Sequence, residues 1–150
     1  MAIQTKTGKA FEYALLKEFY TRLNTSENQV VIIENAPYIT AKECFESFLE
    51  DEQGLYWLVS SSAINFLVDI EPRLSNCKGE DDKLQLELVS DSEGQTGDVR
   101  DVLAIRLLQK WEIGISAKNN RREVKHSRLS LKIDFGEKWI GIPSSEEYFN

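Results

Sequence analysis

The chain opens with apolar residues at helical spacing. Four of them recur at intervals of four positions: Phe11, Leu15, Phe19 and Leu23. Side chains so spaced share one face of an α-helix, so the pattern predicts an amphipathic helix over residues 9–23. A polar break follows at residues 24–28. The apolar run VVII from Val30 is typical of a short strand or of the start of a loop.

The middle of the chain also has a helical pattern. Thr40 and Glu43 have the spacing of a capping box, which predicts a helix that begins there and runs through AKECFESFLEDE. The apolar segment over residues 55–70 predicts a second helix, which Pro72 would end. Residues 78–83 are highly charged and indicate a loop.

The period then changes from that of a helix to that of a strand. LQLELVS from Leu84 alternates apolar and polar residues, which is typical of a half-buried strand. DVLAIRLL from Asp101 and WEIGISAK, which ends at Lys118, predict two further strands. Only Gln109 and Lys110 separate them, so we expect an antiparallel hairpin.

The expected order of elements points to an α/β (α+β) fold. After the hairpin, the pattern predicts a helix near Glu123 and a short strand within KWIGI from Lys138. We therefore expect a central mixed sheet that contains an antiparallel hairpin and is flanked by helices, with a helical insert at about residues 40–80. A chain of 150 residues fits one domain, so we expect a single domain over residues 1–150.

The formal net charge of -7 argues weakly against nucleic-acid binding, which requires cations to contact phosphates. The distribution of charge matters more, however, because DNA contacts only one face of a protein. Residues 118–132 hold six Lys or Arg and one Glu, a local charge of 6 - 1 = +5. Such a run is typical either of a solvated face or of a surface that binds DNA or RNA.

Several classes of protein are disfavoured by the sequence. Cys44 and Cys77 are far apart and His126 is the single histidine, which argues against a zinc site and against a Ser/His/Asp triad. No phosphate-binding GxxxxGK[ST] or GxGxxG motif occurs. The apolar segment at residues 55–70 is too short and too polar to span a membrane. We expect a cytoplasmic protein with two reduced thiols.

The hairpin suggests where chemistry can take place. If Gln109 and Lys110 form a two-residue turn, Asp101 faces Lys118 with Cα atoms about 5 Å apart. A carboxylate that holds Mg²⁺ and a lysine that orients water would suit phosphodiester hydrolysis. The alternative is an ordinary cross-strand ion pair, worth less than about 1 kcal/mol if exposed. Glu112 would lie at the turn end and is expected to be a surface or cross-strand partner.

Several blocks of sequence resemble one known family. TGDVRDVLAIRLLQKWEIGISAKNN, followed by VKHSRLS and DFGEKW, is similar to the core of HaeIII-type type II restriction endonucleases, as is the opening GKAFEYALL. The blocks cover much of residues 8–23 and 96–139. The resemblance implies the PD-(D/E)xK nuclease fold, Mg²⁺-dependent cleavage of double-stranded DNA, and a short GC-rich target of the GGCC kind. It also implies a longer enzyme, of which this chain would be an N-terminal fragment.

The resemblance implies roles for particular residues. Asp101 has the position of the metal-binding aspartate, with Asp98 as a competing choice, and Lys118 matches the lysine of the motif. The general pattern has an acid two positions before that lysine, where this chain has Ser116. A second carboxylate would then come from elsewhere, and the candidates are Glu12, Glu87 and Glu123. Glu12 can equally be a solvated carboxylate on its helix.

The resemblance also implies a DNA-binding segment directly after the lysine. The residues concerned are Asn119, Asn120, Arg121, Arg122, Lys125, His126 and Arg128. Arginine can read guanine with two hydrogen bonds, whereas lysine mainly contributes charge toward phosphates. His126 is expected to contact phosphate or to be structural rather than to act as a general base.

The implied partners are double-stranded DNA, a second copy in a homodimer, and a cognate DNA methyltransferase. Two other functions remain open. One is a repair or defence nuclease of the same fold. The other is an inactive DNA-binding or protein-interaction module, which Ser116 and the acidic net charge favour.

Overall fold

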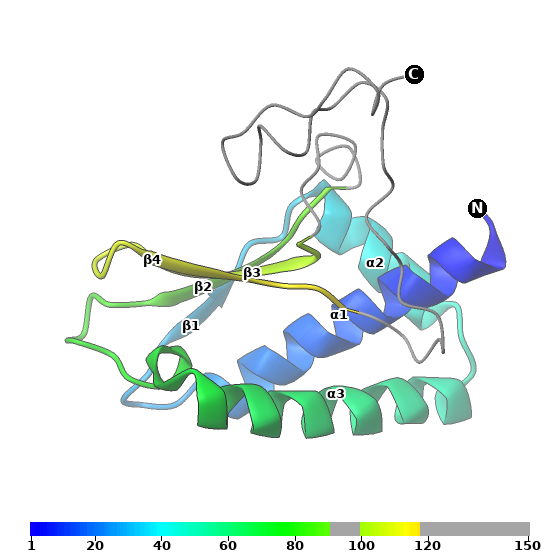
Figure 1. Ribbon diagram of the computed structural model, residues 1–150. Coiled ribbons are helices and arrows are strands. Elements are labelled where there is room, and N and C mark those ends of the chain that lie inside the picture. The colour runs from blue at the N-terminus through cyan, green and yellow to red at the C-terminus, as the bar shows by residue number, and fades with distance from the viewer. Residues whose placement is uncertain (91–99, 118–150) are drawn as a thin grey trace, which may run out of the picture. The chain divides into compact units, whose positions relative to one another are not determined.

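The computed structural model describes residues 1–90 and 100–117, drawn in colour in Figure 1. Its elements follow one another in the order α1 (Ile3–Leu23), β1 (Val30–Ile32), α2 (Ala36–Glu46), α3 (Glu50–Ile70), the 3-10 helix η1 (Pro72–Leu74), β2 (Leu84–Leu88), β3 (Val102–Arg106) and β4 (Trp111–Ile115). The helices and strands expected within the described residues are therefore present, and the run VVII contributes a strand.

The four strands form one mixed sheet in the order β1-β2-β3-β4. β1 pairs with β2 in parallel, and the two later pairs are antiparallel. In this register Leu86 lies opposite Ala104, which lies opposite Ile113 on the other side. Parallel neighbours need a crossover connection, and α2 and α3 lie within the one between β1 and β2. The expected α/β class, with an antiparallel hairpin in a mixed sheet beside helices, is confirmed.

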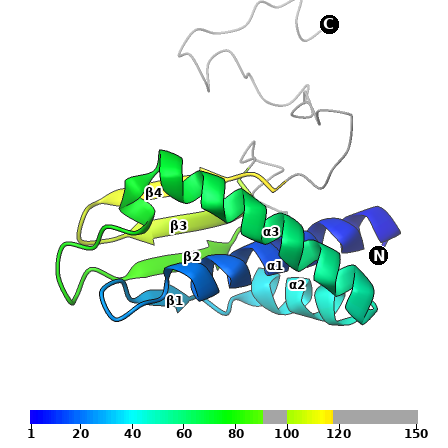
Figure 2. The ribbon, with the colours of Figure 1, turned by 90° about the horizontal axis from the view of Figure 1, so that it is seen from below.

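The core lies between the sheet and the helices that cover one of its faces (Figure 1 and Figure 2). Leu84, Leu86 and Leu88 of β2 are buried against apolar residues of α1, among them Leu16 and Phe19. Each buried leucine of this kind contributes about 1.5–3 kcal/mol. The residues between them in β2 point to the opposite face and are half-buried. The alternation expected for LQLELVS is thus confirmed.

Helix α1 begins six residues before the predicted start. The expected helix covered residues 9–23, whereas α1 begins at Ile3. Residues 1–5 are exposed, so this first part of the helix has no apolar periodicity that a pattern could report. Within it, the Thr7 hydroxyl donates a hydrogen bond to the Ile3 carbonyl (2.9 Å). The start of the pattern marks where the core contact begins and not where the helix begins.

The predicted start of the next helix is wrong. Helix α2 begins at Ala36, and Thr40 and Glu43 lie inside it. Its N-cap is Asn35, whose side-chain oxygen accepts a hydrogen bond from the Tyr38 N–H (3.0 Å). The proline of the first turn also favours this start, because that position needs no N–H donor. The asparagine cap therefore replaces the expected capping box.

The segment AKECFESFLEDE is divided between two helices. Helix α2 ends at Glu46 and α3 begins at Glu50. The Glu52 carboxylate accepts a hydrogen bond from the Leu49 N–H (3.1 Å) and so caps the start of α3. The end of α3 just before Pro72 is as predicted. Trp57 of this helix is partly buried against the core and packs on Phe45, with ring centroids 4.9 Å apart.

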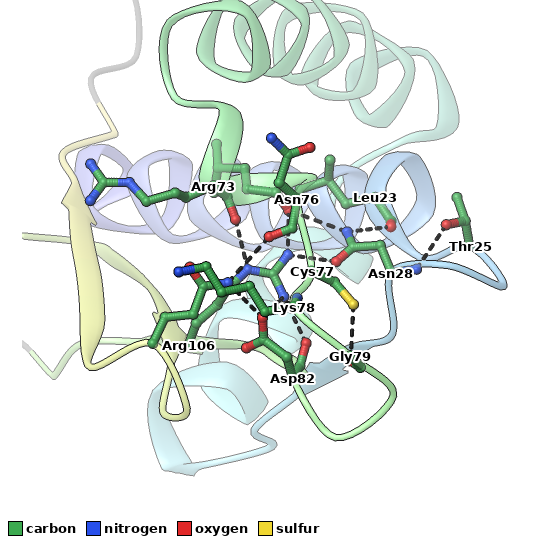
Figure 3. Close-up of polar contacts among 12 residues, drawn as sticks. Leu23, Thr25, Asn28, Arg73, Asn76, Cys77, Lys78, Gly79, Asp82 and Arg106 are labelled. Carbon is green, nitrogen blue, oxygen red and sulfur yellow. Dashed lines mark hydrogen bonds and ion pairs between the residues drawn. The ribbon is translucent and has the colours of Figure 1, made fainter.

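A buried arginine joins several loops at the turn end of the hairpin (Figure 3). The side chain of Arg106 is fully buried. Its Nε donates to the Arg73 carbonyl (2.7 Å) and Nη1 donates to the Asp82 carbonyl (2.8 Å). Nη2 donates to Asn28 Oδ1 (2.5 Å) and to the Leu74 carbonyl (3.0 Å). One guanidinium thus fastens the end of β3 to η1, to the loop before β2 and to the loop before β1.

Asp82 completes this cluster with a buried carboxylate. Its Oδ2 accepts hydrogen bonds from the Lys78 N–H (2.8 Å) and from Gln109 Nε2 (2.5 Å), and lies 3.8 Å from Arg106 Nη1. Burial raises the pKa of this carboxyl, but the bonds from Gln109 and Lys78 and the charge of Arg106 outweigh it and lower the pKa below its ordinary value. The Asp82 carboxylate therefore joins the hairpin turn, through Gln109, to the loop before β2, through Lys78.

Three other expectations have different outcomes. Cys44 and Cys77 are both free cysteines, as predicted. Across residues 1–90 and 100–117, no helix has the length and apolar character needed to cross a membrane. The helix expected near Glu123 and the strand expected from Lys138 lie outside the described residues. The single domain over residues 1–150, with its helical insert, stays a prediction.

Candidate active site

Strands β3 and β4 form the predicted hairpin, but its turn is longer than expected. Four residues, 107–110, connect the strands, and the Lys110 N–H donates to the Leu107 carbonyl (3.1 Å). Arg106 therefore faces Trp111, where a two-residue turn would place Leu108. Two-residue turns favour Asn-Gly or similar pairs with positive φ, and Gln-Lys is not such a pair. The bonds of Arg106 in the buried cluster also fix the end of β3.

The longer turn changes which residue Asp101 faces. Val102 lies opposite Ile115, and the Asp101 N–H donates to the Ile115 carbonyl (2.9 Å). Asp101 is therefore level with Ser116, and the expected pairing with Lys118 is wrong by two positions. A shift of two residues leaves every side chain on the face expected for it. Lys118 itself lies outside the described residues, so its role stays a prediction.

The Asp101 carboxylate receives two hydrogen bonds from the end of β4. Its Oδ2 accepts from the Ala117 N–H (2.6 Å) and from the Ser116 hydroxyl (3.1 Å). The backbone of Asp101 is held on its other side as well, because its carbonyl accepts from the Val89 N–H (3.0 Å). Asp101 is half-buried at the open end of the hairpin. Backbone bonds on both sides thus define the position of Asp101, and the residues that follow β4 define the direction of its carboxylate.

Two of the candidates for a second carboxylate lie among the described residues. Glu87 of β2 is half-buried and lies opposite Leu103, two positions along β3 from Asp101. Residues on adjacent strands with this diagonal offset share a face of the sheet, with Cα atoms roughly 7–8 Å apart. Glu12 is half-buried on α1, the helix that packs against the core. The structure thus brings Glu87 to the face that Asp101 occupies.

An ion pair beside Asp101 was not predicted from the sequence. Arg100 Nη1 lies 2.6 Å from Glu112 Oε1, so Glu112 has a surface partner, as expected, although the identity of that partner was not anticipated. The aliphatic part of Arg100 lies over Gly114, where an added Cβ would overlap Arg100 Cγ and Cδ. A glycine within a strand often marks such a close approach, so Gly114 was the feature of the sequence that could have indicated this contact.

Comparison with known proteins identifies the family. The model of the HaeIII restriction endonuclease family matches residues 8–150. The chain belongs to the HaeIII restriction endonuclease family. It is 36% identical over 143 residues to the type II restriction enzyme HaeIII of Haemophilus aegyptius. That match covers 95% of this chain and 44% of the relative, so the chain spans less than half the length of the relative. No solved structure matches the chain.

The matched family is one of restriction endonucleases, and the sequence resemblance predicts Mg²⁺ as the cofactor. Mg²⁺ prefers oxygen ligands, chiefly carboxylates and water, and the Asp101 carboxylate is such a ligand held in place. Among residues 1–90 and 100–117, no three His, Cys, Asp or Glu side chains cluster closely enough to hold a metal. Among the described residues, Asp101 can therefore supply one carboxylate ligand of a magnesium site.

Other candidates in this member of the HaeIII family lie outside the described residues. They are Asp98, Lys118 and Glu123, together with the proposed DNA-binding residues Asn119, Asn120, Arg121, Arg122, Lys125, His126 and Arg128. Their assignments rest on the sequence and on the family. Ser116 departs from the general motif, and the structure places it against Asp101.

Proposed function

We propose that the chain is the catalytic part of a type II restriction endonuclease that cleaves double-stranded DNA by metal-dependent phosphodiester hydrolysis. Its membership of the HaeIII family is the observation that carries this proposal. The matched relative is named a type II restriction enzyme. The fixed carboxylate of Asp101, at the start of a central strand, is consistent with it. The proposed target is a short GC-rich palindrome of the GGCC kind.

Asp101 is the proposed principal ligand of Mg²⁺, with Asp98 as the competing ligand. The bound ion would offset the charge that develops on the phosphate. Lys118 would orient the attacking water or stabilise that charge by donating hydrogen bonds. The second carboxylate would be Glu12, Glu87 or Glu123, and the geometry favours Glu87 over Glu12 because it shares the face of Asp101. Attack at phosphorus would leave 5′-phosphate ends.

The proposed DNA contacts follow Lys118 in the chain. Arg121, Arg122 and Arg128 are suited to guanine edges or phosphates, and Lys125 to phosphates. A homodimer would present two such sites with twofold symmetry, which suits a palindromic target. A cognate DNA methyltransferase would protect the host genome. The protein would accordingly act in the cytoplasm.

A cleavage assay with the intact chain tests this proposal. Purified protein is incubated with two linear duplexes that differ in one respect, the presence of a GGCC site, each with Mg²⁺ or with EDTA. We expect discrete fragments from the GGCC duplex with Mg²⁺ and none in the other three reactions. Fragments in EDTA would exclude metal dependence, and equal cutting of both duplexes would exclude the proposed target.

An inactive DNA-binding module is a second candidate, favoured by the serine in place of the acid at position 116. This module would bind the GGCC duplex with a strong dependence on salt and cleave nothing with Mg²⁺ or Mn²⁺. A repair or defence nuclease of the same fold would cleave without preference for GGCC. The same pair of duplexes separates all three functions.

A further inference from the structure

The Asp101 carboxylate points toward the residue that replaces the second acid of the general motif. Ser116 and Asp101 lie at the same level of the hairpin, and the Ser116 hydroxyl donates to Asp101 Oδ2 over 3.1 Å. We propose that Ser116 is a positioning residue, which fixes the Asp101 carboxylate in the direction needed to bind a divalent cation. This inference rests on the proposed function, in which Asp101 is a metal ligand.

The backbone of Asp101 is already fixed before the side chain is considered. Its N–H donates to the Ile115 carbonyl of one neighbouring strand (2.9 Å), and its carbonyl accepts from the Val89 N–H on the other side (3.0 Å). Rotation about the side-chain bonds is the freedom that remains. The Ala117 N–H, at 2.6 Å, and the Ser116 hydroxyl both restrict it, because they bind the same carboxylate oxygen.

Two donors on one oxygen determine the carboxylate more closely than one donor does. The Ala117 N–H alone fixes a distance and still allows the carboxylate to pivot about that bond. The Ser116 hydroxyl adds a second direction and removes the pivot. Mg²⁺ tolerates little deviation from octahedral geometry, so a carboxylate that is already oriented binds it with less loss of conformational freedom.

The chemistry of the hydroxyl differs from that of the acid it replaces. An aspartate or glutamate at position 116 would supply a metal ligand, but in the absence of metal it would repel the Asp101 carboxylate. A serine hydroxyl is a hydrogen-bond donor to that carboxylate and carries no charge. A serine at position 116 would therefore support the metal ligand rather than be one, and the expected effect of losing it is about 10-fold in metal affinity.

Direct measurement of cation binding tests this role without relying on cleavage. Mn²⁺ suits the same oxygen ligands as Mg²⁺, and its binding to the full chain is followed by the loss of the electron paramagnetic resonance signal of the free ion. The variants are Asp101→Ala, Ser116→Ala and Ser116→Thr. The matched control is Ser62→Ala, an exposed serine of α3 whose hydroxyl donates to the Leu58 carbonyl. Thermal midpoints in EDTA are measured for all of them.

We expect Asp101→Ala to abolish the Mn²⁺ site and Ser116→Ala to weaken it about 10-fold. Ser116→Thr retains the hydroxyl and should bind within about 3-fold of the wild type, which is the result expected of Ser62→Ala as well. Thermal midpoints in EDTA should stay within about 3 °C of the wild type for both Ser116 variants, since the residue is exposed.

Other outcomes overturn the inference in distinguishable ways. Unchanged Mn²⁺ affinity in Ser116→Ala, with the site lost in Asp101→Ala, would exclude positioning and leave the proposed function intact. A lowered thermal midpoint together with failed rescue by threonine would show a role in folding alone. If Asp101→Ala bound Mn²⁺ as tightly as the wild type, both the positioning role of Ser116 and the role of Asp101 as a metal ligand would be overturned. If Ser116→Ala weakens Mn²⁺ binding as expected but the wild type does not cleave the GGCC duplex, the positioning role would stand and the proposed function alone would be contradicted.

Discussion

The side chain of Arg100 passes over Gly114 of strand β4 and ends at the Glu112 carboxylate of the same strand, with Nη1 2.6 Å from Oε1. A side chain on residue 114 would occupy the space of the Arg100 methylene groups. Glycine weakens a strand, so its presence here is explained by the passage that it leaves for Arg100. The ion pair is partly exposed, and its contribution to stability is therefore expected to be below about 1 kcal/mol.

Replacing Gly114 should uncouple this ion pair. In the wild-type background, a double-mutant cycle on Arg100→Ala and Glu112→Ala should give a coupling energy of about 0.2–1 kcal/mol in urea unfolding. With the added substitution Gly114→Ala, the coupling should fall to zero because the methyl group displaces Arg100. The same coupling in both backgrounds would show that Arg100 reaches Glu112 by another route.

The second prediction concerns the buried guanidinium of Arg106. Arg106→Met should lower the free energy of unfolding by about 3–5 kcal/mol, because it leaves the Asp82 carboxylate buried without its cation and the Asn28 and Leu74 oxygens without a donor. Urea unfolding measures this loss. The exposed Arg22→Ala is the matched control and should change stability by less than about 0.5 kcal/mol. Equal effects of the two variants would contradict the role given to Arg106.

The third prediction is a dependence of stability on acid. The pKa of the Asp82 carboxyl is lower in the folded protein than its ordinary value of 3.8. Its contribution is therefore present in full above about pH 4 and is lost as the pH falls through the lower folded value. Asp82→Asn should be less stable than the wild type at pH 7, and the difference should narrow below pH 4. Urea unfolding between pH 7 and pH 2.5 measures it, and a constant difference would contradict the assignment.

The sequence predicted those parts of the fold where burial repeats with a period. The alternation in Leu84–Leu88 and the spacing of Phe11, Leu15 and Phe19 report core contact directly, and both elements are confirmed. The first part of α1 makes no such contact and was missed. The start of α2 was placed at Thr40 because the capping-box spacing is common, whereas Asn35 caps the helix.

Register was the weakest inference from sequence, because it depends on contacts far away in the chain. The turn begins after Arg106, which is held by groups from Asn28, Arg73, Leu74 and Asp82. No local sequence pattern predicts such a cluster, because its members lie far apart in the chain. The error was an even number of residues, so Asp101 stayed on the expected face, but its partner is Ser116. The family resemblance, which rests on blocks of residues and not on register, was confirmed.

The role of Asp101 is the central claim, and cleavage by one variant tests it most directly. The wild type, Asp101→Ala and the control Asp69→Ala, an exposed aspartate of α3, are compared on the GGCC duplex with saturating Mg²⁺. We predict that Asp101→Ala cleaves more than about 100-fold more slowly, with a thermal midpoint in EDTA lowered by no more than about 5 °C, and that Asp69→Ala cleaves as the wild type does. Cleavage by Asp101→Ala at the rate of the wild type would contradict the account.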